Sequence, residues 1–218
     1  MPCVRVHGFA MSIDGYVAGP DQDLDHPLGV NGPRLHEWVW STQYGRKMMG
    51  EAGGETGIDN EVIAQRDQRV GATIMGRNMY GPIRGPWQDS DAWTGWWGDN
   101  PPFHHPVFAL THFPHPSIEM KGGTSFHFVE TGIEAALDRA FAAADGQDVV
   151  VGGGAATVRQ YLSARLVDDL HLVVVPILLG NGERLFENPG VDFNDYACVD
   201  HIGSSTVTHV HLSKVTAT

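Results

Sequence analysis

The sequence is poor in cysteine and in positive charge, and both shortages narrow the classes of protein that it can encode. Its only cysteines, Cys3 and Cys198, lie far apart and lack the C-x-x-C spacing of a zinc or redox site, so we expect ordinary thiols. The 14 Lys and Arg against 26 Asp and Glu give a net charge of -12, which offers no basic field to nucleic acid. An anionic ligand must therefore be held by a few local donors.

Long apolar runs are also absent. No segment approaches about 18 consecutive apolar residues, and the opening MPCVRVHGFAMSIDG lacks the basic and apolar regions of a signal peptide. We therefore expect a cytoplasmic protein that makes no contact with a membrane. The sequence also lacks H-E-x-x-H, G-x-S-x-G and a complete EF-hand loop, so we expect neither a bound metal nor hydrolysis by an activated serine.

Apolar runs of strand length alternate with helix-like stretches, which predicts a single α/β domain over residues 1–218. The strand-like runs include VRVHGFAMS, ATIMG, PVFAL, SFHFV, DVVVGG and LHLVVVPILL, and the helix-like stretches include RLHEWVWSTQYGRKMM, IEAALDRAFAAA and ATVRQYLS. Strands rich in Val and Ile between helices favour a mainly parallel sheet with helices on both faces. In STVTHVHLSKV, His209 and His211 alternate with apolar residues, which predicts a half-exposed antiparallel edge strand with both histidines on its solvated face.

Two stretches, ATIMGRNMYG and VVVGGGAATVRQYL, each run from a buried-type strand through glycine into a helix. In a parallel sheet both junctions lie at the carboxyl edge, where open α/β sheets bind ligands. Glycine lets a ligand approach the backbone, a helix start supplies N–H groups, and Arg77 adds a planar cation suited to phosphate. A tight turn is the alternative explanation of each glycine run. Neither follows the first strand as G-x-G-x-x-G, which disfavours a Rossmann dehydrogenase.

Candidate carboxylates for the substrate lie elsewhere in the chain. Asp14, in the loop AMSIDGYVAGPDQD after the first strand, is a candidate proton donor or substrate contact; a turn in which it bonds its own backbone is equally supported. Glu37 on RLHEWVW is a second candidate, or else a solvated surface residue. Residues 81–106 hold four of the six tryptophans, and so long a loop is typical of a lid or an interaction surface.

Five motifs in order resemble the dihydrofolate reductase superfamily, and more closely the stand-alone proteins related to the RibD C-terminal reductase domain. They are FAMSIDGYVAGPDQD, IMGRNMYG, VFALTH, VVVGGGAATVRQYL and PILLGNGERLF. The resemblance implies a dihydrofolate reductase-like three-layer sandwich, with a mixed, mostly parallel sheet of about eight strands and an antiparallel C-terminal strand. It also implies NADPH as cofactor, a homodimer, and a Gly-Gly step that can be a cis peptide. In the resemblance LLGNGERLF is a structural turn near the site and the dimer surface.

The resemblance also carries over binding residues one by one. It implies that Val17 and Ala18 lie near the nicotinamide and that the residues after Gly76 lie by the adenosine. Arg77 and Asn78 are expected on the adenosine side, and Thr111 and His112 by the ribose 2′-phosphate. The pyrophosphate is expected along Gly153, Gly154, Ala155, Ala156 and Thr157. With Val17, Ala18 and Gly76, these residues form the full cofactor-binding set that we predict.

Departures from the family's patterns limit the substrate. The Trp-x-x-Pro stretch of dihydrofolate reductases is replaced by DHPLGVNGPRLHEW, and Gly8 stands where ribosylaminopyrimidine reductases have a lysine. We therefore expect hydride transfer from NADPH to a small, planar or conjugated substrate, and the protein is not clearly a dihydrofolate or a ribosylaminopyrimidine reductase. The alternative is a non-catalytic nucleotide-binding or ligand-sensing module, and flavin or deazaflavin is the next cofactor to consider.

Overall fold

The computed structural model describes residues 1–65, 67–81, 85–87, 93–187 and 195–215. Contacts group them into two compact units: Met1–Arg5 with Arg69–Leu166, and Val6–Gln68 with Val167–Thr218. The described strands form one nine-stranded sheet, in the order β10-β11-β8-β1-β7-β3-β4-β6-β5, and a two-stranded sheet of β2 and β9. The main sheet thus has one strand more than the approximate number that the resemblance implied.

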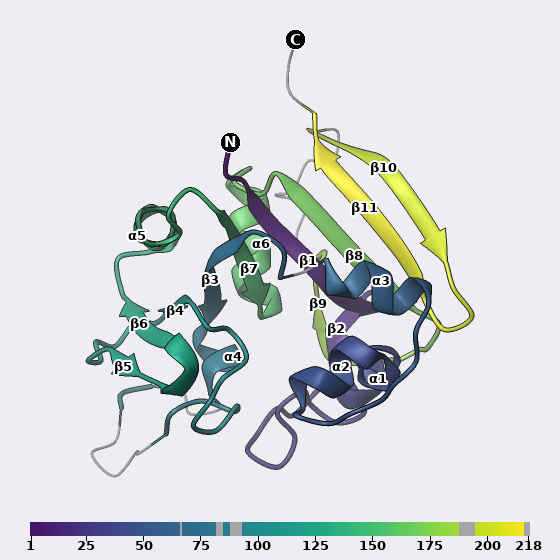
Figure 1. Cartoon of the computed structure of the whole chain (residues 1–218), viewed down its shortest axis with the longest axis horizontal. Coiled ribbons are helices and arrows are strands. Elements are labelled where there is room, and N and C mark those ends of the chain that lie inside the picture. The colour runs from purple at the N-terminus through teal and green to yellow at the C-terminus, as the bar shows by residue number, and fades with distance from the viewer. Residues whose placement is uncertain (66, 82–84, 88–92, 188–194, 216–218) are drawn as a thin grey trace. The chain divides into compact units, whose positions relative to one another are not determined.

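The first unit holds the parallel part of the sheet (Figure 1). The start of β1 (Val4–Ser12) pairs with β7, β7 with β3, β3 with β4 and β4 with β6, all parallel, and β5 is antiparallel to β6. Its strands are β3 (Val70–Gly76), β4 (Pro106–Leu110), β5 (Ile118–Glu119), β6 (Ser125–Val129) and β7 (Asp148–Gly153), and its helices are α4 (Arg77–Tyr80), the 3-10 turn η2 (Lys121–Gly123), α5 (Ile133–Ala143) and α6 (Ala155–Ser163).

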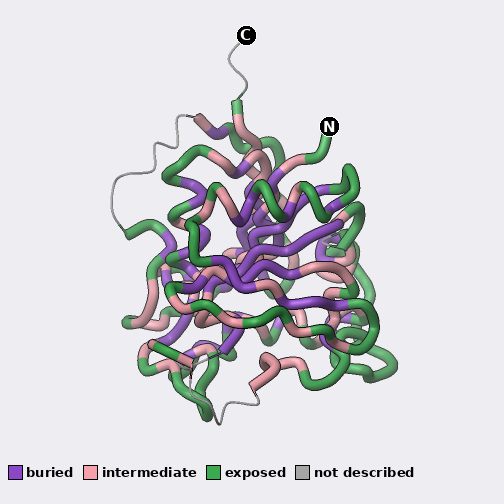
Figure 2. The backbone as a smooth tube through the Cα atoms, turned by 90° about the vertical axis from the view of Figure 1, so that its left-hand side faces the viewer, coloured by how far each residue is buried: buried purple, intermediate pink, exposed green. Residues whose placement is uncertain are grey.

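Burial in this unit follows the apolar runs of the sequence. Nearly every residue of β3 and β7 is buried. Figure 2 colours the backbone by burial, and long buried stretches alternate with exposed ones along the tube. Helix α5 packs on β3, β4 and β7, and α6 packs on β7 and β3. Strands covered in this way lose contact with water along their whole length, which explains their continuous Val and Ile runs.

The second unit holds the remainder of β1 and the antiparallel part of the sheet, where β8 pairs with β11 and β11 with β10. Its strands are β2 (Tyr16–Ala18), β8 (Asp169–Val175), β9 (Glu183–Arg184), β10 (Tyr196–Gly203) and β11 (Thr208–Lys214), and its helices are the 3-10 turn η1 (Gly32–Leu35), α1 (Glu37–Ser41), α2 (Gln43–Met48) and α3 (Ile58–Ala64). The antiparallel C-terminal strand that we predicted is confirmed.

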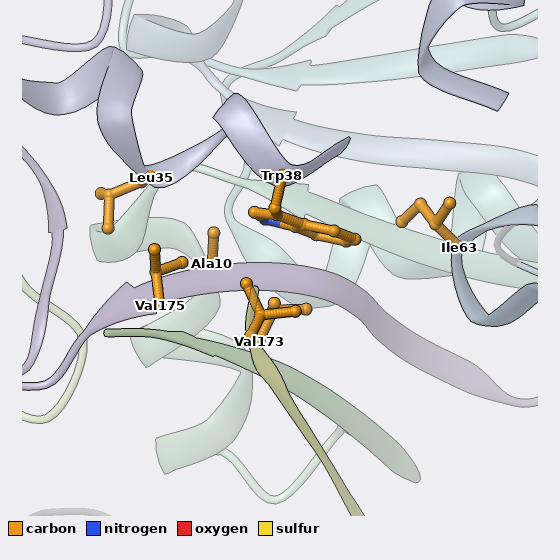
Figure 3. Close-up of a cluster of buried hydrophobic side chains, with 7 residues drawn as sticks. Ala10, Leu35, Trp38, Ile63, Val173 and Val175 are labelled. Carbon is orange, nitrogen blue, oxygen red and sulfur yellow. The ribbon is translucent and has the colours of Figure 1, made fainter. Parts of the chain in front are cut away.

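The core of the second unit forms where helices cover β1 and β8. Figure 3 shows Trp38 of α1 lying between Ile63 of α3 and the strand residues Ala10 and Val173. The Trp38 side chain is only 5% exposed. Truncation of a tryptophan buried to this extent removes about 3–5 kcal/mol of stability, so this ring anchors the helical layer to the strands.

Two predictions about the second unit were wrong. The helix-like stretch RLHEWVWSTQYGRKMM is broken at Thr42, whose backbone is extended and whose hydroxyl accepts the Gly45 N–H at 3.0 Å, capping α2. Strand β11 is not at the edge, because β10 pairs along it; His209 is therefore fully buried and does not lie on a solvated face. The residues YACVDHIG of β10 are mostly exposed, so they carry no apolar alternation from which that strand could be predicted.

Candidate active site

Both predicted glycine junctions lie in the first unit, at the carboxyl ends of adjacent parallel strands. Strand β3 ends at Gly76 and α4 begins at Arg77, while β7 ends at Gly153 and α6 begins at Ala155. Met75 pairs with Gly153 in the β3–β7 register. The two strand-to-helix steps therefore emerge side by side, as the sequence predicted.

Gly76 and Thr157 connect the two junctions directly. A Cβ atom added at Gly76 would lie 2.4 Å from Thr157 Oγ1 and 3.6 Å from the Gly154 nitrogen. The Gly76 backbone has φ -81°, which any residue can adopt, so glycine is required here for space and not for conformation. The start of α6 can lie this close to the end of β3 only because residue 76 lacks a side chain.

The step from β7 into α6 brings bare backbone to the sheet edge. Gly153 has φ 139°, a conformation available mainly to glycine, and the Gly153–Gly154 peptide is cis, as the resemblance allowed. A Cβ at Gly154 would meet no atom within 4 Å. The Gly154 carbonyl accepts the N–H groups of Thr157 and Val158, which begins α6 at this point. The first N–H groups of a helix have no partner within the helix itself. Such a helix start attracts an anion.

Arg77 and Asn78 form the first turn of α4. The Arg77 guanidinium carbon lies 3.2 Å from the centre of the Trp87 ring, and its three nitrogens are buried. Asn78 is half-buried. The stacking fixes the guanidinium plane against an aromatic face, which is a favourable cation–π geometry. A phosphate contact by Arg77 stays a prediction, and it requires access past the Trp87 ring.

Thr111 and His112 follow β4, next to this junction. Leu110 pairs with Gly76 across β3 and β4, so the turn after β4 begins beside Arg77. The buried Thr111 hydroxyl accepts the Phe113 N–H at 3.1 Å, and it lies 3.2 Å from the Phe113 carbonyl, to which it donates. His112 is exposed. The structure thus brings the predicted adenosine-side residues together within one unit.

The predicted nicotinamide and substrate residues lie in the second unit. Val17 and Ala18 belong to β2, which pairs with β9, and Glu37 is an exposed residue at the start of α1. Asp14 lies in the turn between β1 and β2. Their roles toward a ligand stay predictions.

The Asp14 carboxylate accepts hydrogen bonds from other groups of the second unit. The donors are Ser12 Oγ at 2.6 Å, the Gly180 N–H at 2.7 Å and the Leu179 N–H at 3.2 Å. The Ser12 hydrogen bond is the main cause that lowers the pKa of Asp14 to about 2, and the two N–H groups lower it further against the opposing effect of burial. A pKa this low does not favour proton donation, and the role of Asp14 toward a ligand stays a prediction.

The tryptophan-rich segment lies partly outside the described residues, which omit 82–84 and 88–92. Its described part packs on the first unit. Trp93 Nε1 donates to the Tyr80 carbonyl at 3.0 Å, and the Tyr80 hydroxyl donates to the Trp93 carbonyl at 2.9 Å. Trp87 Nε1 donates to the Phe113 carbonyl at 3.0 Å. These bonds tie the segment to α4 and to the turn after β4; a role as lid or dimer surface stays a prediction.

A chain of buried polar groups in the second unit was missed by sequence analysis. The Gly8 N–H donates to His171 Nδ1 at 3.1 Å, His171 Nε2 lies 3.0 Å from His209 Nδ1, and His209 Nε2 lies 2.9 Å from an oxygen of Asp59. Because Gly8 can only donate, His171 carries its proton on Nε2 and His209 carries its proton on Nε2. Burial is the main cause that lowers the pKa of His171 to about 2.

This histidine chain differs from a metal site. Among the described residues, no group of three or more His, Cys, Asp or Glu side chains is arranged to hold a metal ion. The ring nitrogens of His171 and His209 are instead used in hydrogen bonds along the chain. Only the spacing of His209 and His211 in the sequence pointed to this cluster, and it gave no sign of the partners on β8 and α3.

Comparison with solved structures assigns the fold. A Shewanella sp. PV-4 protein whose name places it in riboflavin biosynthesis matches with a TM-score of 0.58 and 18% identity, covering 99% of this chain and 100% of that one. A pyrimidine reductase-like protein from Corynebacterium diphtheriae matches with a TM-score of 0.55 and 16% identity, covering 99% and 93%. Enterococcus faecalis dihydrofolate reductase, complexed with NADP(H) and RAB-propyl, matches with a TM-score of 0.54 and 12% identity, covering 98% and 96%. The protein therefore has a dihydrofolate reductase-like fold.

The family follows from the sequence. The model of the RibD C-terminal domain matches residues 4–210, and the match spans both units. The protein belongs to the RibD C-terminal domain family. A search of curated proteins gave no match. Within the described residues no helix is long and apolar enough to cross a membrane.

Proposed function

We propose that this protein is an NADPH-dependent reductase of a small, planar or conjugated substrate. The observation that carries the proposal is the interlocked pair of junctions, in which the Gly76 backbone, the Thr157 side chain and the Gly154 backbone meet at one edge of the sheet. A turn that served only to connect a strand to a helix would not require a second glycine junction packed against it. The family membership and the NADP(H) complex of a protein with the same fold support the choice of cofactor.

The residues present at this edge fit the phosphates of a dinucleotide. The cradle formed by Gly153 and Gly154 is open, since a Cβ at Gly154 would meet no atom within 4 Å, and α6 begins beside it, where a helix offers N–H groups to an anion. In this proposal the Gly153–Thr157 backbone binds the pyrophosphate, Arg77 and Asn78 bind the adenosine side, and Thr111 and His112 bind near the ribose 2′-phosphate. NADPH, when bound, supplies the hydride.

The chain's own residues bind and orient the reactants. Val17 and Ala18 are proposed to line the nicotinamide end. Glu37 is a carboxylate candidate for the substrate, since it is exposed in the first turn of α1. The proposed reductase is cytoplasmic.

The test is nucleotide titration followed by a substrate screen. NADPH and NADH are titrated by fluorescence, and carbonyl, imine and pterin compounds are then screened for loss of nicotinamide absorbance. NADPH binding with turnover of one class supports the proposal. NADPH binding without turnover of any class supports the non-catalytic nucleotide-binding or ligand-sensing module. No binding of either nucleotide overturns both, and flavin or deazaflavin is tested next.

A further inference from the structure

We propose that Asp14 is a positioning residue of this reductase: its carboxylate fastens the turn after β1 to the turn after β8 and so holds β2 in place. This inference rests on the proposed function, because β2 carries Val17 and Ala18, the residues expected at the nicotinamide. It assigns Asp14 a task different from proton donation or substrate contact. All the residues concerned lie in the second unit.

The carboxylate joins segments far apart in the sequence. One oxygen accepts from Ser12 Oγ at 2.6 Å and from the Leu179 N–H at 3.2 Å, and the other accepts from the Gly180 N–H at 2.7 Å. Leu179 and Gly180 lie 165 and 166 positions after Asp14 in the sequence. Ionised acceptors form the stronger class of hydrogen bond. The bonds from Leu179 and Gly180 therefore fasten the two turns to each other, and the bond from Ser12 holds the carboxylate within its own turn.

The backbone and Arg184 extend this fastening on both sides of Asp14. The Ile13 N–H donates to the Ile177 carbonyl at 3.0 Å. Arg184 Nη1 donates to the Asp14 carbonyl at 3.0 Å, and Arg184 Nη2 donates to the Tyr16 hydroxyl at 2.9 Å. Residues 12–18 and 177–184 are therefore joined before, at and after Asp14; we call this pair of segments the Asp14 clamp.

The far end of the Asp14 clamp is the two-stranded sheet that contains Val17. Tyr16 pairs with Arg184 and Ala18 with Glu183. Gly182 has φ 133°, and a Cβ there would lie 2.0 Å from the Ala18 carbonyl oxygen, so the turn after β8 reaches the backbone of β2 without an intervening side chain. A displacement of this turn would consequently displace the backbone of Ala18.

The chemistry of the clamp suits a permanent anchor. Ser12 is fully buried, and its hydroxyl also accepts the Tyr16 N–H at 3.0 Å, which ties the anchor to the first residue of β2. The other ionisable side chains on the packed elements are Tyr16, Glu183 and Arg184, and the Arg184 guanidinium bonds the Asp14 carbonyl and the Tyr16 hydroxyl. The carboxylate therefore works as a charged acceptor for backbone N–H groups, which an uncharged side chain replaces poorly.

The experiment compares Asp14→Asn with Asp25→Asn, which removes the same charge from an exposed position of the same unit. The probes are NADPH and 2′,5′-ADP, which lacks the nicotinamide half. Asp14→Asn is expected to raise the Kd of NADPH about tenfold, while the Kd of 2′,5′-ADP changes less than about twofold. Asp25→Asn is expected to match the wild type with both probes. A purely structural defect would weaken both probes together.

Hydrogen exchange without nucleotide provides the second measurement. The amides of Leu179 and Gly180 are expected to exchange about tenfold faster in Asp14→Asn and at the wild-type rate in Asp25→Asn. If the wild type binds both probes and Asp14→Asn weakens both equally or neither, the inference is overturned and the proposed function stands. If the wild type binds neither probe, the proposed function fails, and with it the positioning role, whatever the amides show.

Discussion

Gly76 and Thr157 occupy one small volume, and this makes Gly76→Ala the most direct test at the residue scale. The added methyl group would lie 2.4 Å from Thr157 Oγ1, closer than atoms in contact can approach. We expect a loss of about 1–3 kcal/mol in the free energy of unfolding from overpacking, and at least a tenfold weaker NADPH affinity from displacement of the α6 start. Urea unfolding and fluorescence titration measure the two effects.

Gly152→Ala is the matched control, because a Cβ there meets Met79 and Thr73 at ordinary distances of 3.4 Å and 3.5 Å. The double variant Gly76→Ala with Thr157→Ala removes the opposing oxygen and should recover most of the lost stability. If Gly76→Ala is as stable and binds as tightly as Gly152→Ala, the two junctions do not act as one cradle.

Arg77→Ala tests whether its guanidinium binds the 2′-phosphate that distinguishes NADPH from NADH. A charge-assisted contact made only by NADPH predicts that its Kd rises about 10- to 100-fold while that of NADH changes little. Fluorescence titration with both nucleotides gives the ratio. An equal loss for both would assign Arg77 to packing against Trp87, on which it stacks at 3.2 Å.

Single residues also show how far the sequence could be taken. Glycine at a strand end followed by a helix start identified Gly76 and Gly153–Thr157, since backbone geometry follows from local sequence. The local pattern around Asp14 predicted only a turn. Its carboxylate bonds Ser12 nearby and also the N–H groups of residues 179 and 180, which no local pattern connects to it. Contacts between distant segments depend on the tertiary fold.

At the scale of elements, the histidine chain joins β1, β8, β11 and α3, and it predicts sensitivity to acid. His171 has its pKa lowered to about 2 in the folded protein, whereas an unfolded histidine titrates near about 6.5. The unfolded state therefore binds more protons below pH 6.5, and stability falls as the pH falls. We expect the free energy of unfolding to fall by about 2 kcal/mol from this group between pH 6.5 and pH 5.

Urea unfolding at several pH values between 8 and 5 measures this slope, in a range above the titration of most carboxylates. His171→Gln can accept from Gly8 and donate to His209 but cannot titrate, so its slope should be smaller than that of the wild type. His201→Ala, on the exposed β10 strand, is the control and should keep the wild-type slope. A wild-type free energy of unfolding that is constant over this range would contradict the prediction, since it would show that protonating the histidine chain costs no stability.

Elements were predicted best where burial is continuous. The runs VRVHGFAMS, PVFAL, SFHFV and DVVVGG correspond to β1, β4, β6 and β7, because strands covered on both faces are apolar along their length. Strand β10 and helix α3 were missed. Their residues are exposed on one or more sides, and their placement depends on partners such as β11 and the His209 ring, which lie far away in the sequence.

At the scale of the whole molecule, bound NADPH should stabilise the folded protein. A ligand that binds only the folded state at 100 times its Kd adds about 2.7 kcal/mol to the free energy of unfolding. Urea unfolding with and without NADPH measures the difference, and Gly76→Ala should show a smaller gain at the same concentration. Equal stability in the presence and absence of NADPH would contradict the proposed cofactor.

We also expect a homodimer of the 23.7 kDa chain. Ile13 and Leu178 are 61% and 68% exposed, and they lie on the two segments of the Asp14 clamp, which places apolar surface where a partner could cover it. Light scattering after size-exclusion chromatography should give twice the chain mass. A mass equal to one chain would contradict this expectation.

The reciprocal hydrogen bonds between Tyr80 and Trp93, together with the Arg77 guanidinium on Trp87, have an optical consequence. Two indoles are fixed to the helix that carries Arg77 and Asn78, so a nucleotide that contacts this helix changes their surroundings and their emission. Reduced nicotinamide absorbs where tryptophan emits, whereas the oxidised form does not. NADP⁺ would therefore act on the emission through local contacts alone, and NADPH through contacts and energy transfer together, so tryptophan emission would report both the occupancy and the redox state of a bound nucleotide.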